Sequence, residues 1–394
     1  MIFNTWAFGV FLVVTLALYW SVPSRVRPTA LTLFGLYFYW YYYPPHVLLI
    51  VASIPAVWVV SQRIVPGRAG RRRWLALGVA GCLGVLVYYK YQGFLAGTLR
   101  GGLASFGVPV SWAPPRLQPP LGISFFVFEY VHYLIEIGRG TFVPAPLRDL
   151  GLFILFFPTL ICGPIKRYQL FRPQEYAERR FTAVDLHAGL HRIVIGLAKK
   201  TLIADQMAPY SFFVFLHPEQ ASWARLWLAV YAYATQIYFD FAGYSDIAIG
   251  TARLFGYTVP ENFDRPYRQA NIAAFWRTWH MSLTSWITDY VYIPLGGNRR
   301  GPRRAAWNRL VSMTLCGLWH GAAWHFAVWG LYHGVMLNLY RLWAARRPAW
   351  RLPLGLGRVA GTLVTFHVVC LGWVLFVCDL PRAAFVVRRL LGIP

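Results

Sequence analysis

Long apolar runs limit most strongly what this chain can fold into. A helix needs about 20 mainly apolar residues to cross a bilayer, and the longest runs could hold two such helices. Only 13% of the residues are charged, about half the ~25% of a soluble domain. We therefore expect an all-α polytopic membrane protein with a single membrane-embedded domain over 1–394. The runs cover 5–20, 29–60, 74–89, 121–137, 149–165, 190–204, 222–250, 311–340 and 359–379.

Basic residues are concentrated between these apolar runs. The chain has 38 Lys and Arg against 14 Asp and Glu, a formal charge of +24. In a soluble protein this balance would suggest nucleic acid, but clusters such as Arg71 to Arg73 and Arg299 to Arg304 are typical of cytoplasmic loops facing anionic lipid. We expect membrane lipid and no nucleic acid as a partner. No Lys or Arg precedes Arg25, so we expect no cleaved signal peptide at the start.

Two apolar runs do not fit a simple alternation of membrane crossings. One crossing at 149–165 would place its flanking basic clusters on opposite sides of the membrane, although basic loops normally stay in the cytoplasm. The run 311–340 is too long for one straight helix and too short for two. Irregular backbone at membrane depth is tolerated only inside protein or beside water. We therefore expect about 9–11 membrane segments, some of them re-entrant, around a central cavity. The absence of an internal repeat in the sequence disfavours common transporter architectures.

Polar residues interrupt the apolar run at 236–250. Asp240 and Tyr244 are four residues apart and therefore share one helical face. Ionisable groups inside apolar segments are functional candidates, but the same residues also form hydrogen bonds that hold helices together. The sequence leaves both roles open for this segment.

The stretch 262–301 begins with a turn at Asn262 to Pro266 and continues as an aromatic helix that carries His280. The helix is broken by PLGGNRRG, which introduces Pro294 and a pair of glycines. His280 is either a functional residue or a histidine of the core or the membrane interface.

Three histidines lie within the apolar stretch GLWHGAAWHFAVWGLYHG, 317–334. On one continuous helix, which advances about 100° per residue, His325 and His333 would point about 140° and 220° away from His320. The three therefore cannot share one metal ion. Small residues surround the His320 face and would admit another helix or a ligand chain; they are Ala323, Ala327, Gly330 and Gly334.

No other pattern predicts a metal site. His187 and His191 have the four-residue spacing of metal ligands, but no third ligand is near them in sequence, and an interfacial helix face explains them better. The five cysteines are scattered without metal-type or disulfide spacing. We expect neither a bound metal nor a disulfide.

Several of these segments together resemble the membrane-bound O-acyltransferase family, and most closely its bacterial alginate O-acetylation branch. They cover the central half of the chain in the family's order: FPTLICGPIKRY (157–168), YFDFAGYSDIAIG (238–250), NFDRPY (262–267), FWRTWHMSLTSWITDYVYIPLGGNR (275–299) and GLWHGAAWHFAVWGLYHG (317–334). The chain ends soon after GWVLFVCDL (372–380), where alginate-type relatives usually continue, so we expect a minimal core or a shortened chain.

The resemblance implies two landmark histidines, which match His280 and His320, the latter as the catalytic centre. It implies an acyl donor from the cytoplasmic side, such as acetyl-coenzyme A or a similar thioester, with no bound cofactor. The acceptor would be a hydroxyl of an extracytoplasmic polysaccharide or of a partner protein that relays the acyl group. The expected location is the bacterial inner membrane.

We expect His320 to act as general base on the acceptor hydroxyl, because an imidazole titrates near working pH and stays neutral when removed from water. A covalent acyl-histidine route stays open, as do a transporter or flippase and a non-catalytic subunit that anchors a secreted acyltransferase. Further candidates are His280, Asp289, Asn298 and Trp319 to orient the acceptor or stabilise the oxyanion, Asp240 and Tyr244 to bind substrate, and Lys166, Arg167, Arg299 and Arg300 to attract the donor phosphates.

Overall fold

The computed structural model describes residues 3–42, 44–108, 111–112, 114–115, 117–175, 180–346 and 354–393. Within these ranges all regular structure is helical and no strand occurs, which confirms the all-α fold class. The helices form two compact units, and each is described separately: unit 1 comprises Met1–Val194 and Asp246–Pro260, and unit 2 comprises Ile195–Ser245 and Glu261–Pro394. The single domain over 1–394 stays a prediction.

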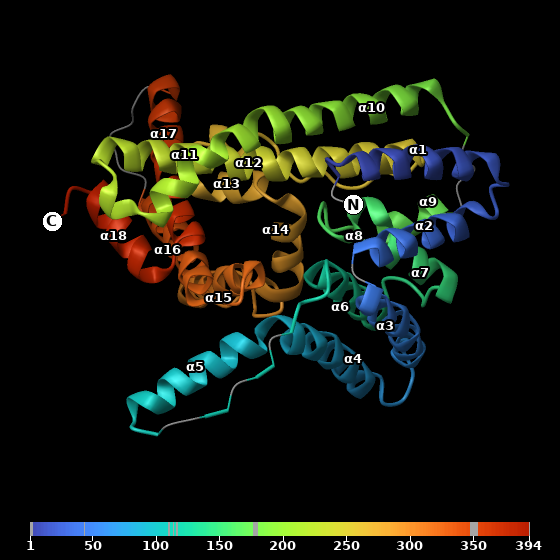
Figure 1. The fold of residues 1–394 in the computed structure, drawn as a ribbon. Helices are drawn as coiled ribbons and strands as arrows, with labels where there is room; N and C mark the ends of the chain where they lie inside the picture. The colour runs from blue at the N-terminus through green and yellow to red at the C-terminus, as the bar shows by residue number, and fades with distance from the viewer. Residues whose placement is uncertain are drawn as a thin grey trace. The chain divides into compact units, whose positions relative to one another are not determined.

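Unit 1 contains the N-terminal helices, drawn in blue to green in Figure 1. Polar caps fix some of their starts; at the first helix, Thr5 Oγ1 accepts a hydrogen bond from the Phe8 N–H at 3.3 Å. Their bounds are α1 (Trp6–Ser21), α2 (Arg27–Tyr42), α3 (Pro44–Arg63), α4 (Arg71–Leu86), η1 (Val87–Tyr91), α5 (Gln92–Ser105), α6 (Ile123–Arg139), α7 (Leu147–Leu155), α8 (Phe157–Leu160), α9 (Tyr168–Glu175) and most of α10 (Ala183–Ala198).

Close backbone contact and ion pairs, one of them buried, hold unit 1 together. A Cβ on Gly35 of α2 would clash with the Leu155 carbonyl of α7, so only glycine permits this approach. Inside the unit, Lys166 Nζ lies 2.6 Å from Glu129 Oε1, and both side chains are almost completely buried. Two further pairs join α10 to α12 (Trp223–Leu254): Arg192 with Asp246, and Arg253 with Asp185, each at 2.6 Å.

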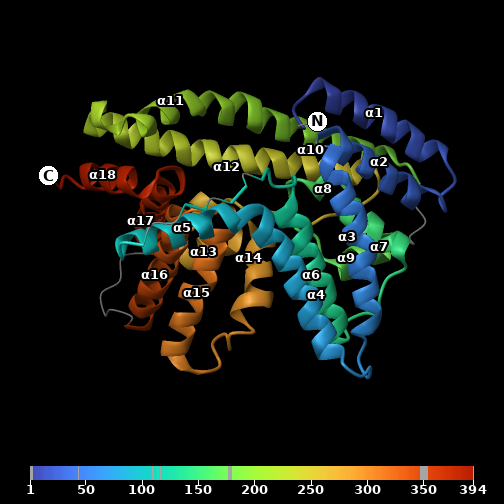
Figure 2. The same cartoon turned by 60° about the horizontal axis from the view of Figure 1, so that its bottom comes forward.

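Unit 2 contains most of α12 and the C-terminal helices, and Figure 2 shows two of them, α15 and α16, running side by side. Asn271 caps α13 by accepting from the Ala274 N–H at 2.8 Å, and Asp379 caps α18 in the same way. The remaining bounds are η2 (Lys199–Ala204), α11 (Asp205–Leu216), η3 (Pro218–Gln220), η4 (Pro266–Arg268), α13 (Ile272–Thr278), α14 (Met281–Ile287), η5 (Thr288–Tyr292), α15 (Gly301–His320), α16 (Trp324–Arg346), α17 (Leu354–Val377) and α18 (Leu380–Leu390).

The core of unit 2 is unusually rich in tryptophan. Trp279, Trp329 and Trp373 are all buried, and Trp329 stacks on Trp373 with ring centroids 5.9 Å apart. Polar tips find partners across helices: Trp373 Nε1 donates to Tyr267 Oη, which in turn donates to the Ala234 carbonyl. These large packed rings give a rigid support for the side chains that lie against them.

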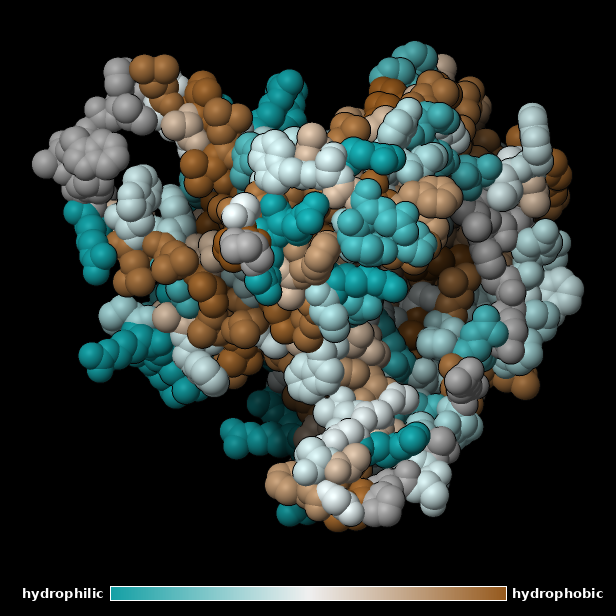
Figure 3. All heavy atoms as spheres, turned by 60° about the vertical axis from the view of Figure 1, so that its left-hand side comes forward, coloured by the Kyte–Doolittle hydropathy of each residue, from teal (hydrophilic) through white to brown (hydrophobic). Residues whose placement is uncertain are grey.

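Three helical segments are long and apolar enough to cross a membrane: Pro44–Arg63, Arg71–Ser105 and Gly355–Val377. Large apolar side chains point outward from the last of these, for example Leu356, Val359 and Val364, and Figure 3 shows hydrophobic side chains at the molecular surface among hydrophilic ones. Such exposure is expected where lipid replaces water. The other long helices, such as α12 and α15, carry several polar or charged residues. The expected 9–11 membrane segments and the central cavity stay predictions.

Candidate active site

His320 is the last residue of α15, at the turn of a helical hairpin. The chain leaves the helix at Gly321 in an extended conformation, and α16 begins at Trp324. A Cβ on Gly321 would overlap the ring of Phe326, so a larger residue there would force that ring to move. The assumption of one continuous helix over 317–334 was therefore wrong, and so were the angles between the three histidines that depended on it.

The small residues near His320 serve helix packing. A Cβ on Gly317 would clash with the Phe326 carbonyl, and one on Gly330 would clash with the Met313 carbonyl. The backbones of α15 and α16 thus touch along these glycines, as small residues at helix interfaces allow. These small residues were expected to admit either another helix or a ligand chain. The structure shows a helix packed against them.

His280 lies at the junction between α13 and α14, in a backbone conformation unusual for a residue with a side chain. Its φ of 43° is in the left-handed region, which costs energy and occurs most often at functional sites. Its side chain is only 1% exposed. The ring Nδ1 is 3.0 Å from Asn262 Oδ1, and Phe241 packs edge-on against the ring with centroids 4.6 Å apart.

The two histidines come together inside unit 2 although 40 positions separate them in sequence. Their ring centroids are 6.4 Å apart, and Trp319 contacts both rings. His320 is only partly buried and packs edge-on against Trp329 and Phe376. The pair therefore consists of one deeply buried ring and one that solvent reaches.

The chemistry of the buried ring follows from its surroundings. His280 lies outside the three candidate spans, and burial lowers the pKa of its imidazole well below the ordinary value, with His320 acting in the same direction. It is therefore neutral at physiological pH. Its Nε2 has no hydrogen-bond partner among the described residues. Leaving a buried acceptor unpaired costs about 1–3 kcal/mol, so a partner supplied by substrate would be favourable.

The other histidines have different surroundings. His325 Nδ1 lies 3.2 Å from the Leu375 carbonyl. His333 is completely buried among aromatic rings, including Trp276 and Trp329. His187 and His191 stack on each other at the surface of α10. Within the described ranges, no group of three His, Cys, Asp or Glu side chains is placed to hold a metal ion.

Several expected substrate-binding residues lie elsewhere in unit 2. Asp240 of α12 is half-exposed and forms an ion pair with Lys200 at 2.8 Å, and Tyr244 of the same helix is half-buried. Asn298 accepts from the Tyr292 hydroxyl at 2.6 Å, and the same hydroxyl contacts Arg309. Arg309 precedes His320 by 11 positions, about 16 Å along a helix. Asn298 is therefore too far from His320 to stabilise an oxyanion there.

The remaining candidates lie on or beside the helical segments that begin after His280 or end at His320. Asp289 is in η5, nine positions after His280 and about 13 Å away along that helix. Arg299 and Arg300 are exposed at the start of α15, whose 20 residues separate them from His320 by about 30 Å. They cannot contact the reacting group, and only a role in attracting an anionic donor fits their position. His280 and Trp319 are the candidates with ring contacts to His320 in the part of the chain that the structure describes.

Lys166 is not placed to attract donor phosphates. Its ammonium is buried in unit 1, bonded to Glu129 and lying over the Phe153 ring. Attraction of the donor phosphates would need an accessible cation, but the Lys166 side chain turns inward to its buried partner Glu129 of α6. Arg167, the next residue, is half-exposed.

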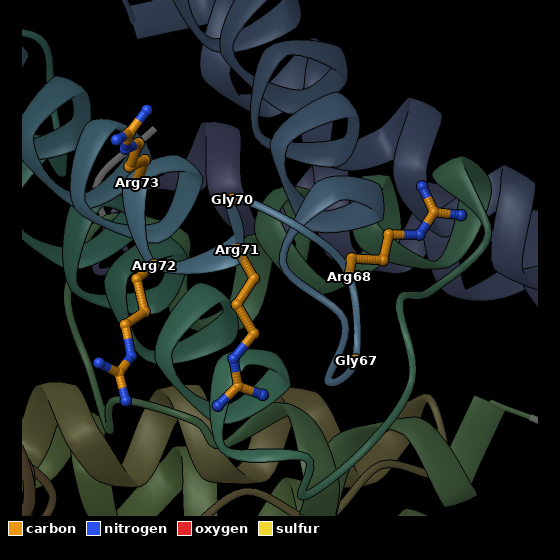
Figure 4. Close-up of a pocket in the computed structure, with 6 residues that line it drawn as sticks. All are labelled: Gly67, Arg68, Gly70, Arg71, Arg72 and Arg73. Carbon is orange, nitrogen blue, oxygen red and sulfur yellow. The ribbon is translucent and has the colours of Figure 1, made fainter.

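A concentrated basic pocket lies in unit 1, between α3 and α4. It has a volume of ≈ 410 Å³ and is lined by Gly67, Arg68, Gly70 and Arg71 to Arg73; Figure 4 shows Arg71 and Arg72 extending to the same side. Both flanking helices are candidate spans. This is the geometry expected of a loop at the membrane surface that faces anionic lipid.

Sequence reasoning missed Asn262, which it read only as part of a turn. Asn262 is 1% exposed and bonds to His280 and Ser282. Its position in the segment NFDRPY, within the resemblance, was the only available signal, because the contact joins residues 18 positions apart.

The helical fold, the candidate spans and the paired histidines define a membrane protein with a site suited to proton transfer by imidazole. The sequence profile of the membrane-bound O-acyltransferase family matches residues 125–354, which include both histidines and Asn262. The chain belongs to this family and is an O-acyltransferase.

Relatives extend the match over nearly the whole chain. A probable alginate O-acetylase of Azotobacter vinelandii is 38% identical, with 95% of this chain and 75% of the relative covered. A peptidoglycan O-acetyltransferase of Helicobacter pylori is 32% identical over 92% of this chain and 73% of its own length. A teichoic acid D-alanyltransferase of Bacillus subtilis is 33% identical over 67% of this chain and 70% of its own. The resemblance to the alginate O-acetylation branch is thereby confirmed.

Proposed function

We propose that the protein transfers an acetyl group from a cytoplasmic acyl thioester, with acetyl-coenzyme A as the simplest donor, to a hydroxyl group. The acceptor is an extracytoplasmic polysaccharide or a partner protein that relays the acetyl group to it, and the membrane is the bacterial inner membrane. The single observation that carries the proposal is the convergence of His280 and His320, one ring buried and the other accessible. The names of the alginate and peptidoglycan relatives support acetyl as the group transferred.

In the proposed reaction, His320 removes the proton from the acceptor hydroxyl while the hydroxyl oxygen attacks the thioester carbonyl carbon. The tetrahedral intermediate then collapses: the new C–O ester bond stays, the C–S bond breaks, and the leaving thiolate takes the proton from His320. No proton is gained or lost overall. Proton transfer of this kind contributes about 10²–10⁴-fold to a rate.

His280 has a supporting role in this proposal. It is neutral and its Nε2 has no hydrogen-bond partner among the described residues, so it can form a hydrogen bond with a polar group of the substrate and orient it. Trp319 packs against both imidazoles and limits their movement. Orientation of the reacting groups is a large contribution in any transfer between two substrates.

The test is His320→Gln and His320→Ala in purified protein, with labelled acetyl-coenzyme A and a panel of candidate glycans. Acetyl transfer should fall about 10²-fold or more, while the variants still insert in membranes in normal amounts. His187→Gln is the matched control, because His187 is an exposed histidine of unit 1, and it should retain full activity.

The same assay distinguishes the other two functions. Near-normal turnover in the His320 variants would refute the proposal and favour a subunit that anchors another acyltransferase. Movement of a substrate across proteoliposomes without any acetylated product would indicate a transporter.

A further inference from the structure

Asn262 forms a clamp on the segment that carries His280. Its backbone carbonyl accepts from the Met281 N–H at 2.9 Å. Its side-chain Oδ1 faces His280 Nδ1 at 3.0 Å and the Ser282 hydroxyl at 2.9 Å. Asn262 thus contacts three consecutive residues beginning with His280, and all of these side-chain contacts are buried.

The orientation of the Asn262 amide follows from its neighbours. The Ser282 backbone N–H, which can only donate, points to Oδ1 at 3.4 Å. On the other side, Asn262 Nδ2 donates to Ser245 Oγ at 3.1 Å. A flipped amide would place its own N–H groups against the Ser282 N–H and lose these bonds. Oδ1 is therefore the atom that faces His280.

This orientation determines which ring nitrogen of His280 carries the proton. A carbonyl oxygen cannot donate a hydrogen bond, so the contact exists only when Nδ1 is protonated. In a neutral imidazole the other nitrogen, Nε2, is then an acceptor. Phe241 packs edge-on against the ring and opposes a ring flip that would exchange the two nitrogens.

We propose that Asn262 is a positioning residue that holds His280 in the tautomer protonated on Nδ1, so that Nε2 faces the reacting groups as a hydrogen-bond acceptor. The inference rests on the proposed acyl transfer at His280 and His320. It adds a residue that touches neither substrate nor His320 and acts only through the ring of His280.

Two variants separate this role from simple packing. Asn262→Leu keeps the approximate shape and removes the acceptor, so kcat should fall at least tenfold while KM changes little. Asn262→Asp keeps an acceptor for the His280 N–H and should retain activity within a few-fold. A carboxylate beside His280 favours its charged form and raises its pKa, so the acid limb of the kcat profile should move to higher pH in Asn262→Asp. A residue that only packs would give the opposite order of activities, because it would tolerate the apolar Leu better than a buried carboxylate.

A direct measurement covers the case in which Asn262→Leu fails to fold. Solid-state NMR of ¹⁵N-histidine-labelled protein, with the His280 signals identified by their loss in His280→Gln, should show a protonated Nδ1 and an unprotonated Nε2. The opposite tautomer in wild-type protein would overturn the inference, and so would wild-type kinetics in Asn262→Leu. His320→Gln is assayed in parallel. Normal activity of His320→Gln would refute the acyl-transfer proposal itself. Loss of activity in His320→Gln together with normal activity of the Asn262 variants would refute only the role of Asn262.

Discussion

At the scale of single residues, the structure separates side chains of similar type by their partners. Lys166 and Arg299 both follow apolar runs, yet Lys166 is buried against Glu129 and Arg299 is exposed. Likewise His320 is accessible, whereas His333 is enclosed by aromatic rings. Side-chain chemistry is similar within each of these two comparisons, so the tertiary surroundings account for the difference in burial.

The Lys166–Glu129 pair gives a prediction at this scale. Lys166→Met alone should lower the free energy of unfolding by about 3–5 kcal/mol, because it leaves an uncompensated buried carboxylate. The double variant Lys166→Met, Glu129→Leu should recover most of that loss. Thermal unfolding of the purified protein in detergent measures both. If Lys166 served the donor instead, the single variant would unfold normally and show a raised KM for acetyl-coenzyme A.

At the scale of helices, the glycines of the α15–α16 hairpin decide where His320 lies. Gly317 and Gly330 bring the two backbones into contact, and the turn at Gly321 ends α15 directly after the histidine. The two helices have 20 and 23 residues and extend beyond both ends of the apolar run 311–340, with the turn inside it. His320, at the end of α15 beside the turn, is partly accessible.

Widening this hairpin should impair both stability and activity. In Gly330→Ala the added methyl group would meet the Met313 carbonyl of α15, and overpacking of this kind costs about 1–3 kcal/mol. A shift of the turn by about 1 Å would reduce acetyl transfer on the order of 10²-fold. Gly84→Ala in α4 is the control, since a Cβ there meets nothing within 4 Å. Equal melting temperatures and rates for the two variants would contradict the prediction.

At the scale of the whole molecule, two features bear on how the chain is oriented in a membrane: its formal charge of +24 and its candidate spans. The clearest case is the Arg68 to Arg73 loop, which joins two candidate spans and forms the basic pocket of unit 1. Basic loops are retained on the cytoplasmic side. This side is also where the proposed thioester donor is available.

Removing this charge should disturb orientation. Replacing Arg68, Arg71, Arg72 and Arg73 by Gln should lower the fraction of chains with this loop in the cytoplasm. A single cysteine introduced at Ala69, in a cysteine-free background, reports the loop's side through labelling of intact cells with a membrane-impermeant reagent. Replacement by Lys keeps the charge and should leave labelling as low as in the parent. Unchanged labelling of the Gln variant would show that this loop does not set the orientation.

The sequence alone determined the helical class and the membrane character, and it singled out the two candidate histidines. Apolar runs and basic loops are local properties that reflect the solvent around each segment, and the motifs carried His280 and His320 directly. The hairpin turn and the clamp of Asn262 on His280 were decided only by tertiary structure. A helix end at Gly321 depends on the packing of Phe326, and the contact of Asn262 with His280 joins separate segments. Such contacts depend on which surfaces meet after folding, and no periodicity or spacing in the chain records that.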